Sequence, residues 1–163
     1  MDGPIHSSSR AVSLYIDELL LSATESVHHV QAFDCHGLCL GVWAEQVAAL
    51  VYNIDAETEA AWRETRVMKF EGRHLRLLDP AELVFPQDQQ PPEIAGRMDT
   101  CLVVLAGHEL ALWSRQPRYF RQPESSLVFR TQRTSRNWLE ATCSQPACAV
   151  LDTGVVAAFA GRF

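Results

Sequence analysis

The sequence lacks the long apolar runs and regularly spaced cysteines that mark membrane and secreted proteins. A membrane-spanning helix needs about 20 apolar residues, whereas an apolar run such as Leu102–Ala106 is far shorter. The N-terminus has neither the charged start nor the apolar run of a secretory signal. The five cysteines are an odd number and follow no disulfide framework. We therefore predict a cytoplasmic protein that inserts into no membrane.

The sequence also lacks the motifs of enzyme chemistry. It contains no GxSxG nucleophile elbow, and no phosphate-binding loop because its eight glycines are scattered singly. The cluster of His28, His29, Cys35, His36 and Cys39 has metal-ligand residue types, but neither CxxC nor HExxH is present. The two cysteines of this cluster also lie on opposite sides of a predicted turn. The sequence therefore predicts no catalytic residue, no metal and no other cofactor.

Two further cysteines flank a short turn near the C-terminus. Cys143 and Cys148 bracket the tetrapeptide Ser-Gln-Pro-Ala, so we expect them to face each other across that turn. Cross-strand cysteines can form a disulfide under oxidation, but disulfides are rare in the cytoplasm. Packed free thiols are therefore the expected state of this pair.

Lysine is nearly absent, and charge is unevenly placed along the chain. Lys69 is the only lysine, and the formal net charge is −6. Residues 1–100 hold 16 acidic and 7 basic residues, whereas residues 101–163 hold 4 acidic and 7 basic residues. The positive block comprises Arg115, Arg118, Arg121, Arg130, Arg133 and Arg136. A nucleic-acid binder would more often be positive overall with interleaved lysines, so we favour a surface that faces solvent or a protein partner.

The N-terminal part of the chain, before the first predicted strand, divides into two predicted segments. Residues 1–9 are expected to be a flexible leader, at the end of which Ser9 can cap a helix. Residues 10–25 carry apolar side chains at spacings of three and four, which predicts an amphipathic helix. Such a helix packs on its own domain or docks on a partner, and the sequence leaves both alternatives open.

From residue 26 onward, short apolar segments are joined by turns that contain glycine. Three such pairs flank Gly37, Gly72 and Gly107, and each is typical of a β-hairpin because glycine tolerates the positive φ of tight turns. Residues 80–84 are predicted to form a helical turn, and residues 153–160 a short helix.

The segments before and after residues 86–98 repeat one another. Residues 86–98 contain three prolines and no apolar run, which is typical of a linker. Gly37 and Gly107 mark the hairpin that opens each segment, and Asp79 and Asp152 each stand just before a short predicted helix. The separation between the two glycines nearly equals the separation between the two aspartates. These similar offsets indicate a duplicated unit of several strands followed by a helix.

The repeat predicts a mostly β fold of two small five-stranded barrels, because short strands in small units avoid open edges by closing on themselves. The first barrel is expected to span about residues 26–86 and the second about residues 98–152. Short helices would end each half, the C-terminal helix would pack back on the domain, and a further helix would precede the first barrel.

Four stretches of the sequence carry a family resemblance. Residues 30–51, 66–84 (RVMKFEGRHLRLLDPAELV) and 101–113 resemble, in this order, the strands of CheW-like domains, the adaptor fold of bacterial chemosensory arrays. Residues 128–159 are most similar to the end of the CheW-like domain of ParP-type array proteins. The resemblance covers about residues 28–160.

The resemblance implies a non-enzymatic scaffold. CheW-like adaptors bind the cytoplasmic tips of chemoreceptors in a groove between two barrels, and they bind the regulatory domain of the histidine kinase CheA barrel against barrel. ParP-type domains are similarly thought to couple an array to a cell pole, which adds a polar localisation factor to the expected partners. Two alternatives stay open: a localisation module that docks through residues 10–25, and an OB-like nucleic-acid binder that uses Arg115–Arg136.

Two departures from the family pattern mark the expected binding surface. Glu71-Gly72 stands where many CheW proteins have Arg-Gly, which reverses a charge, and Trp113-Ser114-Arg115 stands where Val-Asp often ends a strand. Tryptophans at an interface bury a large area at small entropic cost. The predicted partner-binding residues are Trp43, Glu71, Gly72, Arg73, Trp113, Arg115 and Trp138.

Overall fold

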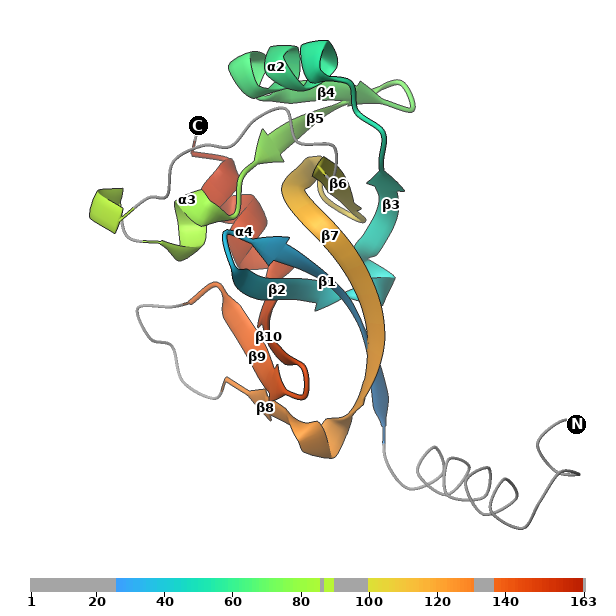
Figure 1. Ribbon diagram of the computed structural model, residues 1–163, viewed down its shortest axis with the longest axis vertical. Helices are drawn as coiled ribbons and strands as arrows, with labels where there is room; N and C mark the ends of the chain where they lie inside the picture. Colours follow the sequence, from blue (N-terminus) through green and yellow to red (C-terminus); the bar gives the residue numbers. More distant parts are fainter. Residues whose placement is uncertain (1–25, 86, 90–99, 131–136, 163) are drawn as a thin grey trace, which may run out of the picture.

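The computed structural model describes residues 26–85, 87–89, 100–130 and 137–162, so the expected leader, N-terminal helix and most of the expected linker lie outside the described residues. The fold is mostly β, as predicted (Figure 1). The strands are β1 (Val27–Cys35), β2 (Leu38–Trp43), β3 (Val47–Val51), β4 (Val67–Phe70), β5 (Arg73–Leu78), β6 (Thr100–Leu105), β7 (Leu110–Pro123), β8 (Leu127–Phe129), β9 (Leu139–Ser144) and β10 (Ala147–Leu151). The α-helices of the described residues are α2 (Ala56–Thr65), α3 (Ala81–Val84) and α4 (Thr153–Ala160).

The three predicted glycine turns are confirmed. The β1–β2 turn has φ of 51° at His36 and 89° at Gly37, and the β4–β5 turn has φ of 50° at Glu71 and 79° at Gly72. Gly107, with φ of 79°, lies in the turn between β6 and β7. Two successive residues with positive φ give the tight turn whose twist matches that of the flanking strands.

Strand pairing does not follow the predicted division into two sequence halves. The hydrogen-bonded order is β3-β6-β7-β1-β2-β10-β9-β8, with β5 also pairing with β7 and β4 with β5. Strands β1, β2, β8, β9 and β10 form what we call the first lobe, and strands β3 to β7 form the second lobe. Each lobe draws strands from both halves, so the expected boundaries at 26–86 and 98–152 do not correspond to the lobes. In the described residues this path runs from β3 to β8 without closing into a ring.

The exchange between halves follows the repeat that the sequence shows. The strand before each Asp-started helix pairs in parallel with the second strand of the other half's hairpin: β5 with β7, and β10 with β2. Asp79 accepts a hydrogen bond from the backbone N–H of Ala81 at 2.9 Å, and Asp152 accepts one from Val155 at 3.2 Å. Asp152 is the N-cap of α4, and Asp79 stands one residue before the N-cap of α3, Pro80; both aspartates offer an acceptor to an N–H group of the first helical turn.

The long strand β7 connects the lobes, as Figure 1 shows. Its first part pairs with β6 and β5 in the second lobe, and its last part pairs with β1 of the first lobe. Alternate residues of β7 face different cores: Leu112 belongs to a central cluster, whereas Ala111 and Trp113 belong to the second lobe's own cluster. The strand is buried on both faces here, which explains why its sequence alternates weakly between apolar and polar residues.

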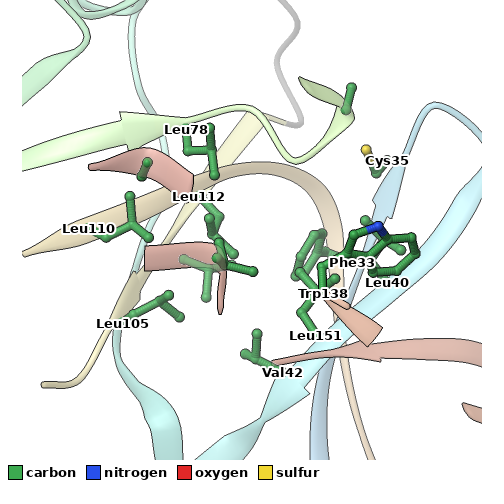
Figure 2. Packing of buried hydrophobic residues seen from close by; sticks show 14 residues of the cluster. Phe33, Cys35, Leu40, Val42, Leu78, Leu105, Leu110, Leu112, Trp138 and Leu151 are labelled. Carbon is green, nitrogen blue, oxygen red and sulfur yellow. The ribbon is translucent and has the colours of Figure 1, made fainter. Parts of the chain in front are cut away.

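The central cluster fills the space between the lobes (Figure 2). Phe33 of β1 enters it from the first lobe, Leu78 and Leu112 enter it from the second lobe, and all three are completely buried. Helix α4 adds Val156 and Ala160. Because burying apolar surface is the main favourable term in folding, this shared cluster holds the two lobes together as one body.

Gly41 lies at a close approach inside the first lobe, and its replacement by alanine tests that packing. A Cβ built there would lie 2.8 Å from Cγ1 of Val30 and 3.2 Å from Sγ of Cys148. Overpacking of this kind costs about 1–3 kcal/mol, so we expect Gly41→Ala to lower the free energy of unfolding by about that amount in urea denaturation. The matched control is Gly154→Ala in α4, where the nearest atom is 3.4 Å away. The control should gain up to about 1 kcal/mol from helix propensity, and equal losses in the two variants would contradict the close approach.

Candidate partner-binding site

The structure separates the predicted site residues into four places. Trp43 and Trp138 are only 6% and 8% exposed and pack in the first lobe's cluster and the central cluster, so they are not exposed anchors. Glu71, Gly72 and Arg73 are exposed together at the tip of the β4–β5 hairpin. The remaining two are Trp113 and Arg115 on β7, which meet where the lobes join. Large aromatics also supply much of the apolar area that a small core needs, which accounts for the burial of Trp43 and Trp138.

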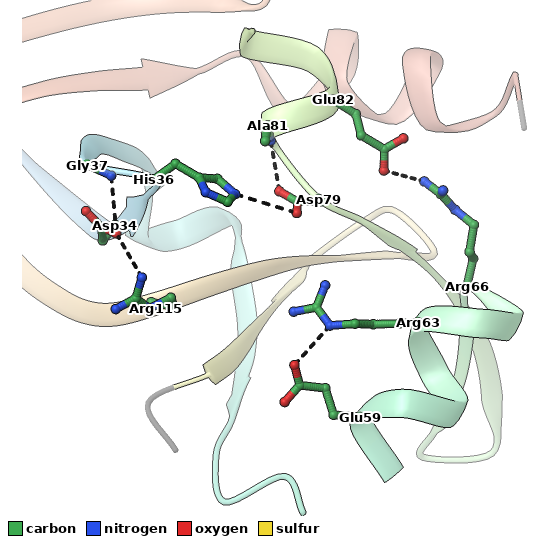
Figure 3. A network of polar contacts seen from close by, with 10 residues as sticks. All are labelled: Asp34, His36, Gly37, Glu59, Arg63, Arg66, Asp79, Ala81, Glu82 and Arg115. Atoms are coloured by element: carbon green, nitrogen blue, oxygen red, sulfur yellow. Dashed lines mark hydrogen bonds and ion pairs between the residues drawn. The ribbon is translucent and has the colours of Figure 1, made fainter. Parts of the chain in front are cut away.

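The lobes join at a group of polar side chains that we call the seam (Figure 3). The first lobe contributes Asp34 and His36 from the end of β1 and its turn, and the second lobe contributes the others from α2, the β5–α3 link and β7. The members of the seam are Asp34, His36, Arg63, Asp79, Trp113 and Arg115.

One ion pair and one histidine–carboxylate contact cross the seam. Nη1 of Arg115 lies 3.8 Å from Oδ2 of Asp34, and Nε2 of His36 lies 4.0 Å from Oδ2 of Asp79. These four side chains are between 18% and 26% exposed. Partly exposed polar contacts at such distances contribute little free energy each, so their main effect is to favour one alignment of the lobes.

Arg63 makes the best-defined contacts of the seam. Its Nε donates a hydrogen bond to Oε2 of Glu59 at 2.9 Å, and its guanidinium carbon lies 4.2 Å from the ring centre of Trp113. The Glu59 side chain is 1% exposed, so its carboxylate is buried beside the guanidinium of Arg63 (Figure 3). A guanidinium over an indole face is a favourable cation–π arrangement, and here it also explains why Trp113 is buried.

The seam offers no nucleophile and little space. Burial, and then the charges of Asp79 and Asp34, raise the pKa of the Cys35 thiol to about 12, so that sulfur stays protonated at neutral pH. The cavity between these residues measures about 40 Å³, which is room for a water molecule and far below the roughly 300–1,000 Å³ of typical small-molecule sites. The arrangement suits alignment of two surfaces and not the binding of a substrate.

A larger hollow, which we call the groove, lies between the β4–β5 hairpin, the start of β7 and the end of α4. It measures about 410 Å³ and is lined by Thr65, Arg66, Val67, His74, Leu75, Arg76, Leu77, Leu78, Glu109 and Ala160. Val67 is 39% exposed. Half of these lining residues are apolar, and charged members of the lining stand beside them: Nη2 of Arg66 lies 2.5 Å from Oε1 of Glu82, and Nη1 of Arg76 donates to the carbonyl of Ala160 at 3.3 Å. Sequence reasoning missed the groove, because elements far apart in the chain form its walls.

The cluster of histidines and cysteines in residues 28–39 does not converge on one point. Nε2 of His28 lies 3.1 Å from Oε1 of Glu124, and Nδ1 of His29 lies 2.6 Å from the hydroxyl of Tyr119. His36 faces the seam instead. In the part of the chain that the structure describes, no three His, Cys, Asp or Glu side chains are arranged to hold a metal ion.

The arginine block does not form a single patch. Arg115 faces Asp34, Arg118 donates from Nη2 to Sγ of Cys39 at 3.2 Å, and Arg130 donates to the carbonyl of Asn137. Arg133 and Arg136 lie outside the described residues. Because these guanidinium groups have partners within the protein, the observed contacts do not favour the nucleic-acid alternative, for which phosphate contacts would need them.

Comparisons with known proteins bear on the fold. No protein-family model matches the sequence, and no curated protein matches it. Among solved structures, the crystal structure of the scaffolding protein TtCheW from Thermoanaerobacter tengcongensis matches with a TM-score of 0.60 at 10% sequence identity. The match covers 78% of this chain and 90% of that chain. The protein has a CheW-like fold.

This likeness confirms the predicted fold class, and it does not extend to the ParP-type specificity that residues 128–159 suggested. TtCheW is described as a scaffolding protein. None of the helices in the described ranges is long and apolar enough to cross a membrane.

Proposed function

We propose that the protein is a non-enzymatic scaffold of a bacterial chemosensory array that binds chemoreceptor tips and the regulatory domain of a CheA-type histidine kinase. The observation that carries this proposal is the likeness of its fold to the scaffolding protein TtCheW over most of both chains. The protein would lie in the cytoplasm with receptor arrays, and the ParP-type resemblance of residues 128–159 adds a polar position and a polar localisation factor.

The groove is the surface we assign to the receptor tip. Its apolar lining with charged groups beside it matches the usual anatomy of interfaces, which have an apolar core and a polar rim. Receptor tips of this family are helical, and a helix binds a groove by placing its apolar face against such a lining. Val67 is the exposed apolar side chain of the groove and would be the first contact.

The β4–β5 turn stands at one end of the same hairpin and would select among partners. Glu71 and Arg73 are exposed, so their charges are available to a bound partner at little cost to the fold. Glu71 occupies the position at which the family often has arginine, so this scaffold would favour a partner with positive charge there. The seam would act behind this surface by keeping the two lobes aligned.

Titration calorimetry tests the proposal. The full chain is titrated with a receptor signalling-tip fragment and, separately, with a CheA regulatory domain. We expect a dissociation constant on the order of micromolar for each, which is about −8 kcal/mol and suits reversible array contacts of modest area. Heat-unfolded protein serves as the control. Absence of binding to both partners at micromolar concentration would contradict the scaffold function.

A further inference from the structure

Three cysteines lie side by side on three neighbouring strands of the first lobe. Cys148 of β10 pairs directly with Cys143 of β9 in the antiparallel register. On its other side, β10 pairs in parallel with β2 through Ala149 and Leu40, and one step back along that register Cys148 meets Cys39. Cys39 is also one of the partly buried side chains that pack against the cluster containing Cys143 and Cys148. We call Cys39, Cys148 and Cys143 the thiol row.

The thiol row has an accessible end and a buried end. Cys39 is partly exposed, whereas the other four cysteines of the chain are buried, and all five are free thiols. Nη2 of Arg118 lies 3.2 Å from Sγ of Cys39 and brings a positive charge to that sulfur. A thiol reacts with a dissolved reagent only where the reagent can reach it, and Cys39 is the cysteine that meets this condition. Cys39 is therefore the member that a reagent in solution would meet first.

Cys148 is placed to form a disulfide with Cys39. Neighbouring strands lie about 4.7–4.9 Å apart, which falls within the Cα separation of about 4.4–6.8 Å that disulfides span. Burial raises the pKa of both Cys148 and Cys143, so neither thiol is the first to react; Cys148 reacts only after Cys39 has been oxidised, when an electrophilic sulfur lies beside it. The thiol of Cys143 donates to the carbonyl of Pro146 at 3.3 Å, which directs it toward the β9–β10 turn.

We propose that the thiol row is an oxidation site at which a hydroperoxide joins Cys39 to Cys148 in a disulfide. The Cys39 thiolate attacks one oxygen of the hydroperoxide, an S–O bond forms, the O–O bond breaks, and the alkoxide leaves and takes up the proton that Cys39 released. Sulfur loses two electrons and the peroxide gains them. The Cys148 sulfur then attacks the Cys39 sulfenic acid, an S–S bond forms, and the hydroxyl leaves with the Cys148 proton as water. This inference does not depend on the proposed function.

The disulfide would fix the order of strands in the first lobe. It would link β2 to β10 and enclose most of the chain within its loop, and a cross-link over a long loop restricts the unfolded chain most. Strand β10 leads through Asp152 into α4, whose Ala160 lines the groove. Oxidation would therefore stiffen one wall of the groove, and it should raise the melting temperature of the protein by several degrees.

Peptide mapping under non-reducing conditions tests the proposal. The full chain is treated with hydrogen peroxide, free thiols are alkylated, and the protein is digested with trypsin. Lysine and arginine positions place Cys39 in fragment 11–63, and Cys143 and Cys148 together in fragment 137–162. We expect the two fragments to be linked, whereas a Cys143–Cys148 bond would stay within one fragment. Absence of the linked fragments at saturating peroxide, or a bond confined to fragment 137–162, would overturn the proposal.

Single substitutions assign the bond. Cys39→Ser should abolish the linked fragments without unfolding the protein, because Cys39 is not in the buried core. Cys143→Ser should leave the link in place, and so should Cys35→Ser, whose sulfur lies in the same tryptic fragment but belongs to the central cluster. A link that persists in Cys39→Ser, or that disappears in Cys143→Ser while that variant stays folded, would contradict the assignment.

Discussion

Replacing Arg63 by alanine is expected to lower the free energy of unfolding by about 3–5 kcal/mol, a large part of the roughly 5–15 kcal/mol that typically stabilises a domain. The reason is Glu59, which is 1% exposed and receives a hydrogen bond from Nε of Arg63 at 2.9 Å. Removing the guanidinium leaves a carboxylate buried without this partner, and it also removes the cation–π contact with Trp113. Alanine is a good helix former, so α2 itself would not be the cause. Urea denaturation measures the change.

Two controls separate charge burial from other effects. Glu82→Gln removes the charge of a comparable pair, but Arg66 and Glu82 are 42% and 29% exposed, so the loss should stay below about 1 kcal/mol. The double variant Glu59→Gln with Arg63→Ala also removes the charge of the buried Glu59 carboxylate. It should recover at least half of the free energy of unfolding that Arg63→Ala loses. If Arg63→Ala lowers the free energy of unfolding no more than Glu82→Gln does, the buried pair of Glu59 and Arg63 does not stabilise the seam. The same conclusion follows if the double variant is no more stable than Arg63→Ala.

The hairpins and helix starts were predictable because their causes are local. A glycine with positive φ forms a tight turn wherever two strand-forming segments flank it, which placed β1–β2, β4–β5 and β6–β7 correctly around Gly37, Gly72 and Gly107. Asp152 marked the start of α4 because a carboxylate satisfies the first N–H groups of a helix. Helix α2 was missed even though Asp55 caps it in the same way, because its surface is too polar to show a strong apolar stripe.

Strand pairing depends on contacts between residues far apart in the chain, and the local pattern does not contain them. The repeat of Asp79 and Asp152 indicated two similar units correctly, yet each unit's last strand pairs with the other unit's hairpin. Both arrangements bury the same alternating residues within each strand, so periodicity alone does not choose between them. In the observed arrangement Phe33 of the first half and Leu112 of the second half are buried in the same central cluster, a contact between distant residues that the local pattern does not predict.

The candidate site was predictable in part. Glu71 and Arg73 are exposed because they flank a tight turn at the tip of a hairpin, a local fact that the sequence shows. The groove depends on the end of α4 lying near β5, and Arg76 reaches the carbonyl of Ala160 from a distant part of the chain. Trp113 was expected at an interface, and it lies instead beneath Arg63, at the junction between the two lobes of the same chain.

The sharpest test of the assigned receptor surface is Val67→Arg. Val67 lies on β4, lines the groove and is 39% exposed. An arginine there can extend its charged end into solvent, so the fold should tolerate it, while its bulk and charge would occupy the apolar lining. Loss of a central contact typically costs about 2 kcal/mol or more, so we expect binding of the receptor-tip fragment to weaken by roughly 30-fold. Titration calorimetry at fixed ionic strength measures the change.

Val128→Arg is the matched control, because Val128 is a 70% exposed valine on β8 in the first lobe and lines none of the groove. Both variants should unfold within about 0.5 kcal/mol of the parent protein, as surface substitutions usually do. Receptor binding should weaken in Val67→Arg alone, because only that side chain would stand between the groove and a bound helix. Equal affinities in the two folded variants would show that the receptor tip binds elsewhere, whereas a loss confined to Val128→Arg would move the interface to the edge of the first lobe.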